Sequence, residues 1–106
     1  MSTQLNEKRQ WTFVTSHTQV LLCIARDPNA RMRDVAASVG ITERAAQRIL
    51  ADLVEAGYVR RTRVGRRNRY TIDETMMMRH AAQAGHEIGG LLELLRLEPP
   101  PGAEQR

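Results

Sequence analysis

A chain of 106 residues, with 42% hydrophobic residues, 26% charged residues and a net charge of +4, can form one domain with a modest core. Its apolar content is ordinary, which argues against a disordered or fibrous protein. No apolar run reaches the roughly 20 residues of a membrane span, residues 1–10 lack a signal-peptide core, and the single cysteine excludes an internal disulfide framework. We therefore expect a cytoplasmic protein that has no contact with a membrane.

The charge is unevenly distributed along the chain. Residues 1–56 carry seven basic and six acidic side chains, residues 57–72 carry six arginines and no acid, and residues 73–106 carry three basic and six acidic side chains. A concentrated basic segment on a neutral chain indicates a polyanionic partner. A solvated charged surface is the alternative, although mixed charges would keep the protein equally soluble.

The first residues are expected to be a flexible arm, because residues 1–10 are polar and without periodicity. The run 11–15, WTFVT, is β-prone and predicts a short strand that must pack on something, since a single strand is not stable alone. Two interpretations remain open for its aromatic side chains. Trp11 and Phe13 either cover the first helix as part of the core or contact a second protomer.

The first helix is predicted over residues 17–26, with Thr15 or Ser16 as its N-cap. Its apolar side consists of Val20, Leu21, Ile24 and Ala25. Cys23 lies in this helix and is expected to be a small buried hydrophobic residue. Asp-Pro-Asn at 27–29 ends the helix, because the residue before proline avoids helical angles and Asp and Asn favour turns.

Residues 33–57 predict two helices joined by a tight turn. Ala36 is small enough for close crossing of the helices, Gly40 can take the positive φ of a helix end, and Thr42 is a good N-cap for the second helix. Gly57 ends that helix. Its inward stripe is Ala46, Ile49, Leu50, Leu53 and Val54.

The segments 58–64 and 69–72 are β-prone and flank a turn-like run at 65–68, which predicts a hairpin. Two helices followed by a basic hairpin form the winged helix-turn-helix arrangement, so the expected fold class is mainly α with a small β-hairpin wing. Residues 32–51 resemble the helix-turn-helix of bacterial regulators, and GYVRRTRVGRRNRYTI resembles the wing of MarR- and ArsR-type transcription regulators. The resemblance covers residues 16–72 and implies DNA binding and regulation of transcription.

The end of the chain predicts a linker with three methionines at 76–78 and a helix over residues 80–97. Its apolar stripe has no obvious place in a winged-helix core of this size, and in similar regulators a terminal helix forms the dimer. We therefore expect a homodimer, with a helix folded back on its own domain as the alternative. The expected interface is Trp11, Phe13, Ile88, Leu91, Leu92 and Leu95.

The expected domain organisation has four parts: a flexible arm at 1–10, a winged-helix DNA-binding domain at 11–72, a linker and dimerisation helix at 73–97, and a flexible tail at 98–106.

Double-stranded DNA is the expected partner, and the second helix is expected to read it. The side chains on its outer face are Thr42, Glu43, Arg44, Gln47 and Arg48. Arginine can bond guanine through both acceptors, and glutamine can read adenine. Glu43 would repel phosphate, so it either accepts from cytosine or orients a neighbouring arginine. The alternative is an exposed helix face with a Glu43–Gln47 pair and no DNA contact.

The hairpin is expected to contact the DNA backbone and minor groove. Arg66 and Arg67 lie at its predicted tip, where narrow A·T tracts attract arginine. Arg61, Arg63 and Arg69 are predicted as secondary phosphate contacts.

Other functions are less well supported by the sequence. Some ArsR-type relatives sense metals through a cysteine pair, but residues 35–38 contain no cysteine, and His80, His86 and Glu87 do not converge on one helix face. We expect no metal and no cofactor. Because the sequence has no phosphate-binding glycine loop and no nucleophile–base constellation, we expect that the protein is not an enzyme.

The predicted function is a sequence-specific, dimeric repressor. A non-specific architectural DNA-binding protein and a winged-helix protein-interaction module are the alternatives. Whether a small-molecule effector is sensed stays open, with residues 76–78 and the dimer seam as the first places to look.

Overall fold

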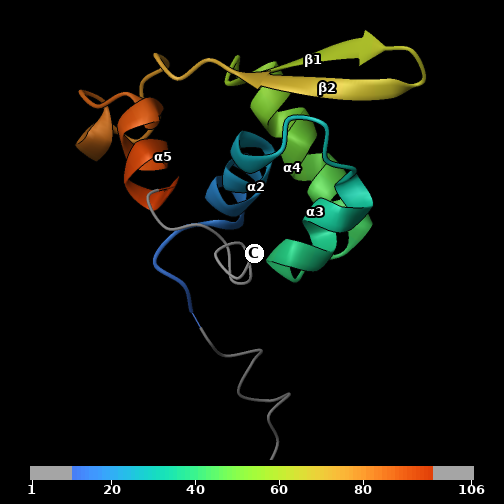
Figure 1. Cartoon of the computed structure of the whole chain (residues 1–106). Coiled ribbons are helices and arrows are strands. Elements are labelled where there is room, and N and C mark those ends of the chain that lie inside the picture. The colour runs from blue at the N-terminus through green and yellow to red at the C-terminus, as the bar shows by residue number, and fades with distance from the viewer. Residues whose placement is uncertain (1–10, 97–106) are drawn as a thin grey trace, which may run out of the picture.

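The computed structural model describes residues 11–96 of the chain. This part contains four helices, one short 3₁₀ turn and a two-stranded antiparallel hairpin, which confirms the mainly α fold with a wing (Figure 1). The elements in chain order are α2 (Ser16–Arg26), α3 (Met32–Val39), α4 (Glu43–Glu55), β1 (Val59–Val64), β2 (Arg67–Ile72), η1 (Ala81–Gln83) and α5 (Ile88–Arg96). The predicted arm at 1–10 and tail at 98–106 lie outside the described residues.

The starts of α2 and α4 are fixed by threonine caps. Thr15 Oγ1 accepts a hydrogen bond from the backbone N–H of Thr18 at 3.2 Å, and Thr42 Oγ1 accepts from that of Ala45 at 3.0 Å. Each bond satisfies one of the N–H groups that the first turn of a helix leaves unpaired. The predicted cap of α4, Thr42, is therefore confirmed. Of the two candidates for the cap of α2, the structure has Thr15.

A sharp left-handed turn joins α3 to α4. Gly40 has φ 87°, a conformation that costs glycine little because it lacks a Cβ atom, and its N–H donates to the carbonyl of Ala36. Ala36 and Ala46 are both buried, and their small side chains let α3 and α4 pack closely. This confirms the predicted helix–turn–helix. Helix α3 begins at Met32.

One hydrophobic core joins α2, α3, α4, the base of the hairpin and α5. Its most completely buried side chains are those of Val20, Ile24, Val35, Leu50 and Leu92. Cys23, predicted to be buried, is only half-buried and packs against the edge of this core. No helix among residues 11–96 is long and apolar enough to cross a membrane.

The hairpin has a tighter turn than the sequence predicted. Strand pairing runs from Val59 opposite Ile72 to Val64 opposite Arg67, so only Gly65 and Arg66 connect the strands. Gly65 has φ 65°, whereas no non-glycine residue has positive φ among residues 11–96. A two-residue loop with positive φ only at its first residue is the type II′ pattern, which matches strand twist. The predicted four-residue turn at 65–68 is therefore wrong at its second half.

Backbone hydrogen bonds attach the hairpin to the helices. The N–H of Tyr70 donates to the carbonyl of Pro28, in the α2–α3 loop, at 2.9 Å. At the base of the hairpin the N–H of Asp73 donates to the carbonyl of Tyr58 at 2.9 Å, and the Tyr58 hydroxyl donates to the carbonyl of Met77. The wing is thus held to the domain on both of its sides.

The predicted strand at 11–15 is absent, and the interpretation of its side chains as a lid on the core is wrong. Trp11 is 73% exposed and Phe13 is 93% exposed, and their rings contact each other edge to face at 4.8 Å. Within residues 11–96 no strand pairs with this segment, and Thr12 Oγ1 instead donates to the carbonyl of Val14. The alternative interpretation, contact with a second protomer, stays a prediction.

The terminal helix begins later than predicted, because only Ile88–Arg96 of the described residues 80–96 are α-helical. Met77 and Glu87 form an isolated antiparallel bridge instead: the Ile88 N–H donates to the Met76 carbonyl at 2.8 Å, and the Met78 N–H donates to the His86 carbonyl at 3.0 Å. Gly85, a poor helix former, lies in this region. The hydrogen bonds that a longer helix would use internally are thereby made between two chain segments.

Helix α5 packs against α2 on the side of the molecule opposite the projecting wing (Figure 1). Ile88 and Leu92 are buried in this packing, and Arg96 forms an ion pair with Glu74 at 3.3 Å. The expectation that the apolar stripe has no place in its own domain is therefore wrong. Ile88 and Leu92 serve the protomer's core, whereas Leu91 and Leu95 are half-buried and Leu94 is 63% exposed.

Candidate nucleic-acid interface

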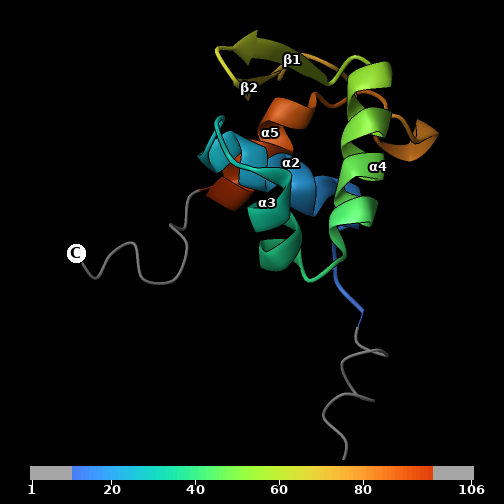
Figure 2. The same ribbon diagram turned by 90° about the vertical axis from the view of Figure 1, so that its right-hand side faces the viewer.

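Helix α4 presents a polar face to solvent because its apolar stripe turns inward. Ala46, Ile49, Leu50 and Leu53 are buried. The exposed side chains are those predicted to contact DNA: Thr42, Glu43, Arg44, Gln47 and Arg48. In Figure 2, which faces the side to which the wing projects, the hairpin lies above α3 and beside the upper end of α4. The wing and the polar face of α4 therefore belong to one side of the molecule.

The strand register separates the wing arginines into two sets. Arg61 pairs across from Tyr70, and Arg63 from Asn68, so both arginines share the face of the hairpin that carries buried Tyr70. Arg69 pairs with Thr62 and points to the opposite face, as does Arg60. The structure thus brings Arg61 and Arg63 together, and it separates Arg69 from them, although all three were predicted as one set of phosphate contacts.

A hollow of about 510 Å³ lies between the start of α3, the outer face of α4 and the wing. We call it the basic groove. Its charged and amide-bearing walls include Arg31, Arg33, Glu43, Gln47, Arg61, Arg66 and Arg67. Two predicted recognition residues and three predicted wing residues therefore meet here. Arg44, Arg48, Arg63 and Arg69 are exposed outside its walls.

Arg31 and Arg33 were absent from the predicted set. Arg31 is the N-cap residue of α3 and uses no side-chain hydrogen bond for capping, so its guanidinium is free to face the groove. Both side chains are exposed and flank buried Met32. The missed signal was the helical spacing of Met32, Val35 and Ala36, which places 31 and 33 on the outward side once the helix is started at 32.

Arg67 has a different position from the one predicted. It is the first residue of β2, and its Nη2 donates to the carbonyl of Asn29 at 3.1 Å. The guanidinium is therefore held against the α2–α3 loop, and it is Arg66 that lies at the tip with Gly65. Arg63 Nε donates to the carbonyl of Gly65 at 3.2 Å, which orients a further arginine beside the tip.

No acid neutralises the groove arginines in the part of the chain that the structure describes. Within residues 11–96 the Arg–carboxylate ion pair is Glu74–Arg96, and His17 and Asp52 share a hydrogen bond; neither contact involves a residue of the basic groove. Hydrogen bonds from the Thr75 side chain and backbone lower the pKa of the Asp73 carboxyl, beyond the end of β2.

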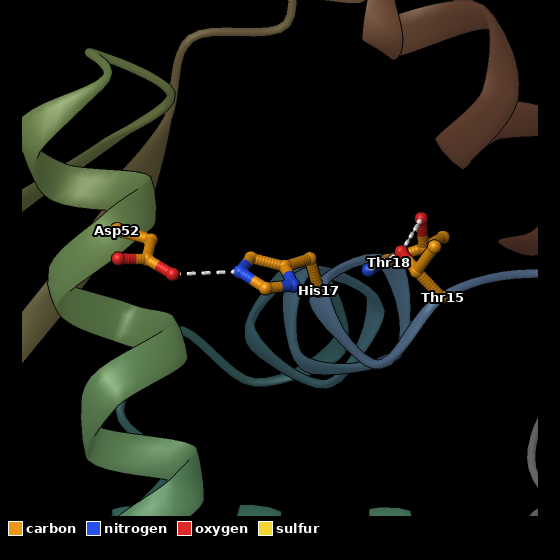
Figure 3. A network of polar contacts seen from close by, with 4 residues as sticks. All are labelled: Thr15, His17, Thr18 and Asp52. Carbon is orange, nitrogen blue, oxygen red and sulfur yellow. Dashed lines mark hydrogen bonds and ion pairs between the residues drawn. The ribbon is translucent and has the colours of Figure 1, made fainter.

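A second hollow, of about 680 Å³, lies between the start of α2, the end of α4 and α5. On its wall His17 Nε2 lies 2.8 Å from Asp52 Oδ2, a hydrogen bond that joins α2 to α4 (Figure 3). Met78, from the predicted methionine segment, also lines it. No group of three or more His, Cys, Asp or Glu side chains among residues 11–96 is arranged to hold a metal ion.

Three helices, a positive-φ turn before α4 and a basic hairpin beside it define a winged helix-turn-helix protein of the DNA-binding type. A model of the MarR family matches residues 13–69, more than half of the chain. The protein belongs to the MarR family of winged-helix transcription regulators. Comparison with curated proteins gave no match, and comparison with solved structures gave none either.

Proposed function

We propose that this protein is a sequence-specific, dimeric repressor that acts in the cytoplasm by occupying a pseudo-palindromic operator. The observation that carries the proposal is the basic groove. Five arginines from α3 and the wing converge beside the exposed polar face of α4, with no ion pair to any acid among residues 11–96. A groove of unpaired guanidinium groups next to a helix that bears base-reading side chains is suited to a nucleic-acid duplex.

In this proposal the start of α4 enters the major groove. Arg44 or Arg48 bonds guanine O6 and N7, and Gln47 reads adenine N6 and N7. The hydroxyl of Thr42, which accepts from the Ala45 N–H, can still donate its hydrogen to a phosphate oxygen. Arg66 at the hairpin tip enters the minor groove, where a narrow A·T tract concentrates negative potential.

The remaining groove arginines bind phosphates that flank the major groove. The two on α3 and the two on the hairpin strands approach the same hollow from opposite walls, so a sugar–phosphate backbone passing through it meets positive charge on both sides. Hydrogen bonds from Tyr70 to the α2–α3 loop and from Arg67 to Asn29 hold the two walls at a fixed position relative to each other. This arrangement positions α4 and carries no sequence information itself.

A homodimer would place two recognition helices about 34 Å apart, in successive major grooves. We propose that its interface uses exposed and half-buried apolar side chains on the face away from the wing. These are Trp11, Phe13, Leu91, Leu94 and Leu95. Ile88 and Leu92, buried in the core, would support this surface from beneath.

A small-molecule effector, where the regulator responds to one, would fit the hollow between α2, α4 and α5. Its wall contains the His17–Asp52 bond, so a ligand there would touch the junction of the first helix with the recognition helix. The hollow also borders Leu91 of the proposed dimer surface. A ligand bound in this hollow would thus be able to alter both the proposed dimer surface and the orientation of α4.

The test is selection of duplexes from a random-sequence library by the full-length protein, followed by titration of the enriched duplex and a scrambled duplex by fluorescence anisotropy. Enrichment of a pseudo-palindrome, bound roughly 10³-fold or more tightly than its scrambled form, is expected. Tight binding without enrichment would instead establish an architectural protein. Absence of binding at low salt would overturn the DNA-binding proposal and favour a protein-interaction module.

A further inference from the structure

Glu43 is the one acidic side chain among residues 11–96 that lines the basic groove. It is the first residue of α4, is exposed, and lies opposite the arginines of α3 and the hairpin. A carboxylate in this position opposes the charge that makes the groove attractive to phosphate. Its presence therefore needs a physical account.

Two simple accounts do not suffice. Glu43 does not orient an arginine, because no basic nitrogen of residues 11–96 lies within 4.0 Å of its carboxylate, and it forms no hydrogen bond with Gln47. A carboxylate at a helix N-terminus does interact favourably with the helix dipole. That interaction is available on any helix, however, and it leaves the repulsion between Glu43 and a bound phosphate unchanged.

We infer that Glu43 is a specificity-determining residue of this protein, which disfavours every duplex that does not place a cytosine amino group against it. This inference rests on the proposed sequence-specific DNA binding. In the major groove cytosine presents the N4 amino donor, whereas adenine presents its N6 donor beside the N7 acceptor. A carboxylate only accepts hydrogen bonds, so adenine N7 repels it and cytosine does not.

Glu43 thus supplies the repulsive part of recognition. The arginines attract any duplex through its phosphates, and discrimination requires a group that makes the wrong duplex worse as well as groups that make the right one better. Because α4 begins at Glu43, the carboxylate is at the end of the helix that approaches the bases first. Only the hydrogen bond to cytosine offsets the cost of bringing it among phosphates.

The size of the effect follows from its two components. A carboxylate roughly 7 Å from one phosphate in a water-like dielectric weakens binding about threefold. Loss of a base contact weakens binding to the correct duplex on the order of tenfold. Because the phosphate repulsion acts in both complexes and cancels in their ratio, removing the Glu43 side chain should reduce the preference for the selected over the scrambled duplex by about tenfold for one half-site.

The experiment titrates wild type, Glu43→Ala and Glu43→Gln with the duplex enriched from the random library and with its scrambled form. Both variants should bind the scrambled duplex about threefold more tightly, because both lose the charge. Glu43→Ala should bind the enriched duplex about threefold more weakly, because the roughly tenfold loss of the base contact is partly offset by the same threefold gain. Glu55→Ala is the matched control, since it removes the same charge from the other end of α4, on the wall of the second hollow. Circular dichroism melts check that all variants fold.

Replacing each C·G pair of the enriched duplex in turn adds a base-resolved readout. Replacement of one such pair should weaken binding of the wild-type protein on the order of tenfold and leave binding of Glu43→Ala unchanged. A purely structural role of Glu43 at the helix terminus would not produce this difference. If Glu43→Ala discriminates as well as Glu55→Ala and wild type, the inference is overturned and the proposed function stands. If wild type itself does not discriminate, both are overturned.

Discussion

The arginines at the start of α3 give the sharpest test of the basic groove, because their contribution was visible only in the structure. The perturbation is Arg33→Ala. Arg33 is exposed, makes no ion pair within residues 11–96, and follows buried Met32 in the first turn of α3. Its removal should therefore leave folding nearly unchanged and remove one positive charge from the groove.

The magnitude follows from release of counterions. If the four phosphate-binding arginines and Arg66 in the minor groove each displace one counterion equivalent, the log–log salt slope of binding is roughly −4.5 for one protomer, at about −0.9 for each arginine. Raising salt from about 50 to about 200 mM then weakens wild-type binding by roughly 500-fold. The Arg33→Ala protein should have a slope of roughly −3.6 and should lose only about 150-fold, with doubled exponents in a dimer.

The assay is fluorescence anisotropy with a scrambled duplex, so that base contacts do not contribute, at four or more salt concentrations. Arg79→Ala is the matched control: it removes one positive charge from an exposed residue that lines the second hollow, away from the wing. Its slope should equal that of wild type. Equal slopes for Arg33→Ala and wild type would refute the passage of a phosphate backbone through the groove, and equal changes in both variants would indicate only a net-charge effect.

Two further predictions concern the end of the chain. A Cβ at Gly89 would lie 2.8 Å from the Glu74 backbone oxygen, whereas one at Gly90 would meet nothing within 4 Å. In urea titrations Gly89→Ala should therefore lower the free energy of unfolding by about 1 kcal/mol or more. Gly90→Ala should raise it by roughly 0.5–1 kcal/mol. A result in which both substitutions stabilise would contradict the close pairing of this segment with the start of α5. Leu91→Glu combined with Leu95→Glu should give a monomer by light scattering, and a surviving dimer would move the proposed interface to the aromatic residues near the N-terminus.

Local chemistry made the helix–turn–helix predictable. A threonine that can cap, a glycine that can take positive φ and an apolar stripe at helical spacing all favour the same structure between residues 32 and 57, and the structure has that arrangement. Gly40 and Thr42 act through neighbours within four residues in the chain. No information from distant parts of the sequence was needed.

The errors occurred where distant segments decide the outcome. Residues 11–15 are β-prone but pair with no strand among residues 11–96, so their propensity is not expressed. Residues 80–87 have enough apolar side chains for a helix, yet the Met76 and Met78 backbone groups take hydrogen bonds with residues 86–88 instead. The strand preference of residues 11–15 was lost because no partner strand was present. The helix preference of residues 80–87 was overridden by pairing with a distant segment.

The basic surface itself shows why charge along the chain is a poor guide to charge in space. Counting arginines in residues 57–72 assigns the whole basic surface to the wing, but the strand register turns Arg60 and Arg69 to the face opposite Tyr70. Two further positive charges in the groove come from Arg31 and Arg33, which belong to the near-neutral residues 1–56.

What joins the two contributions is the contact of β2 with the α2–α3 loop, where Tyr70 N–H donates to Pro28 and Arg67 to Asn29. These bonds fix the wing against the start of α3, so the hairpin cannot swing independently of the helices. The entropy of ordering the groove is then lost on folding and not on binding DNA, which raises affinity without any added contact. Phosphate recognition by this protein is therefore a property of the junction between wing and helix more than of the arginine-rich segment alone.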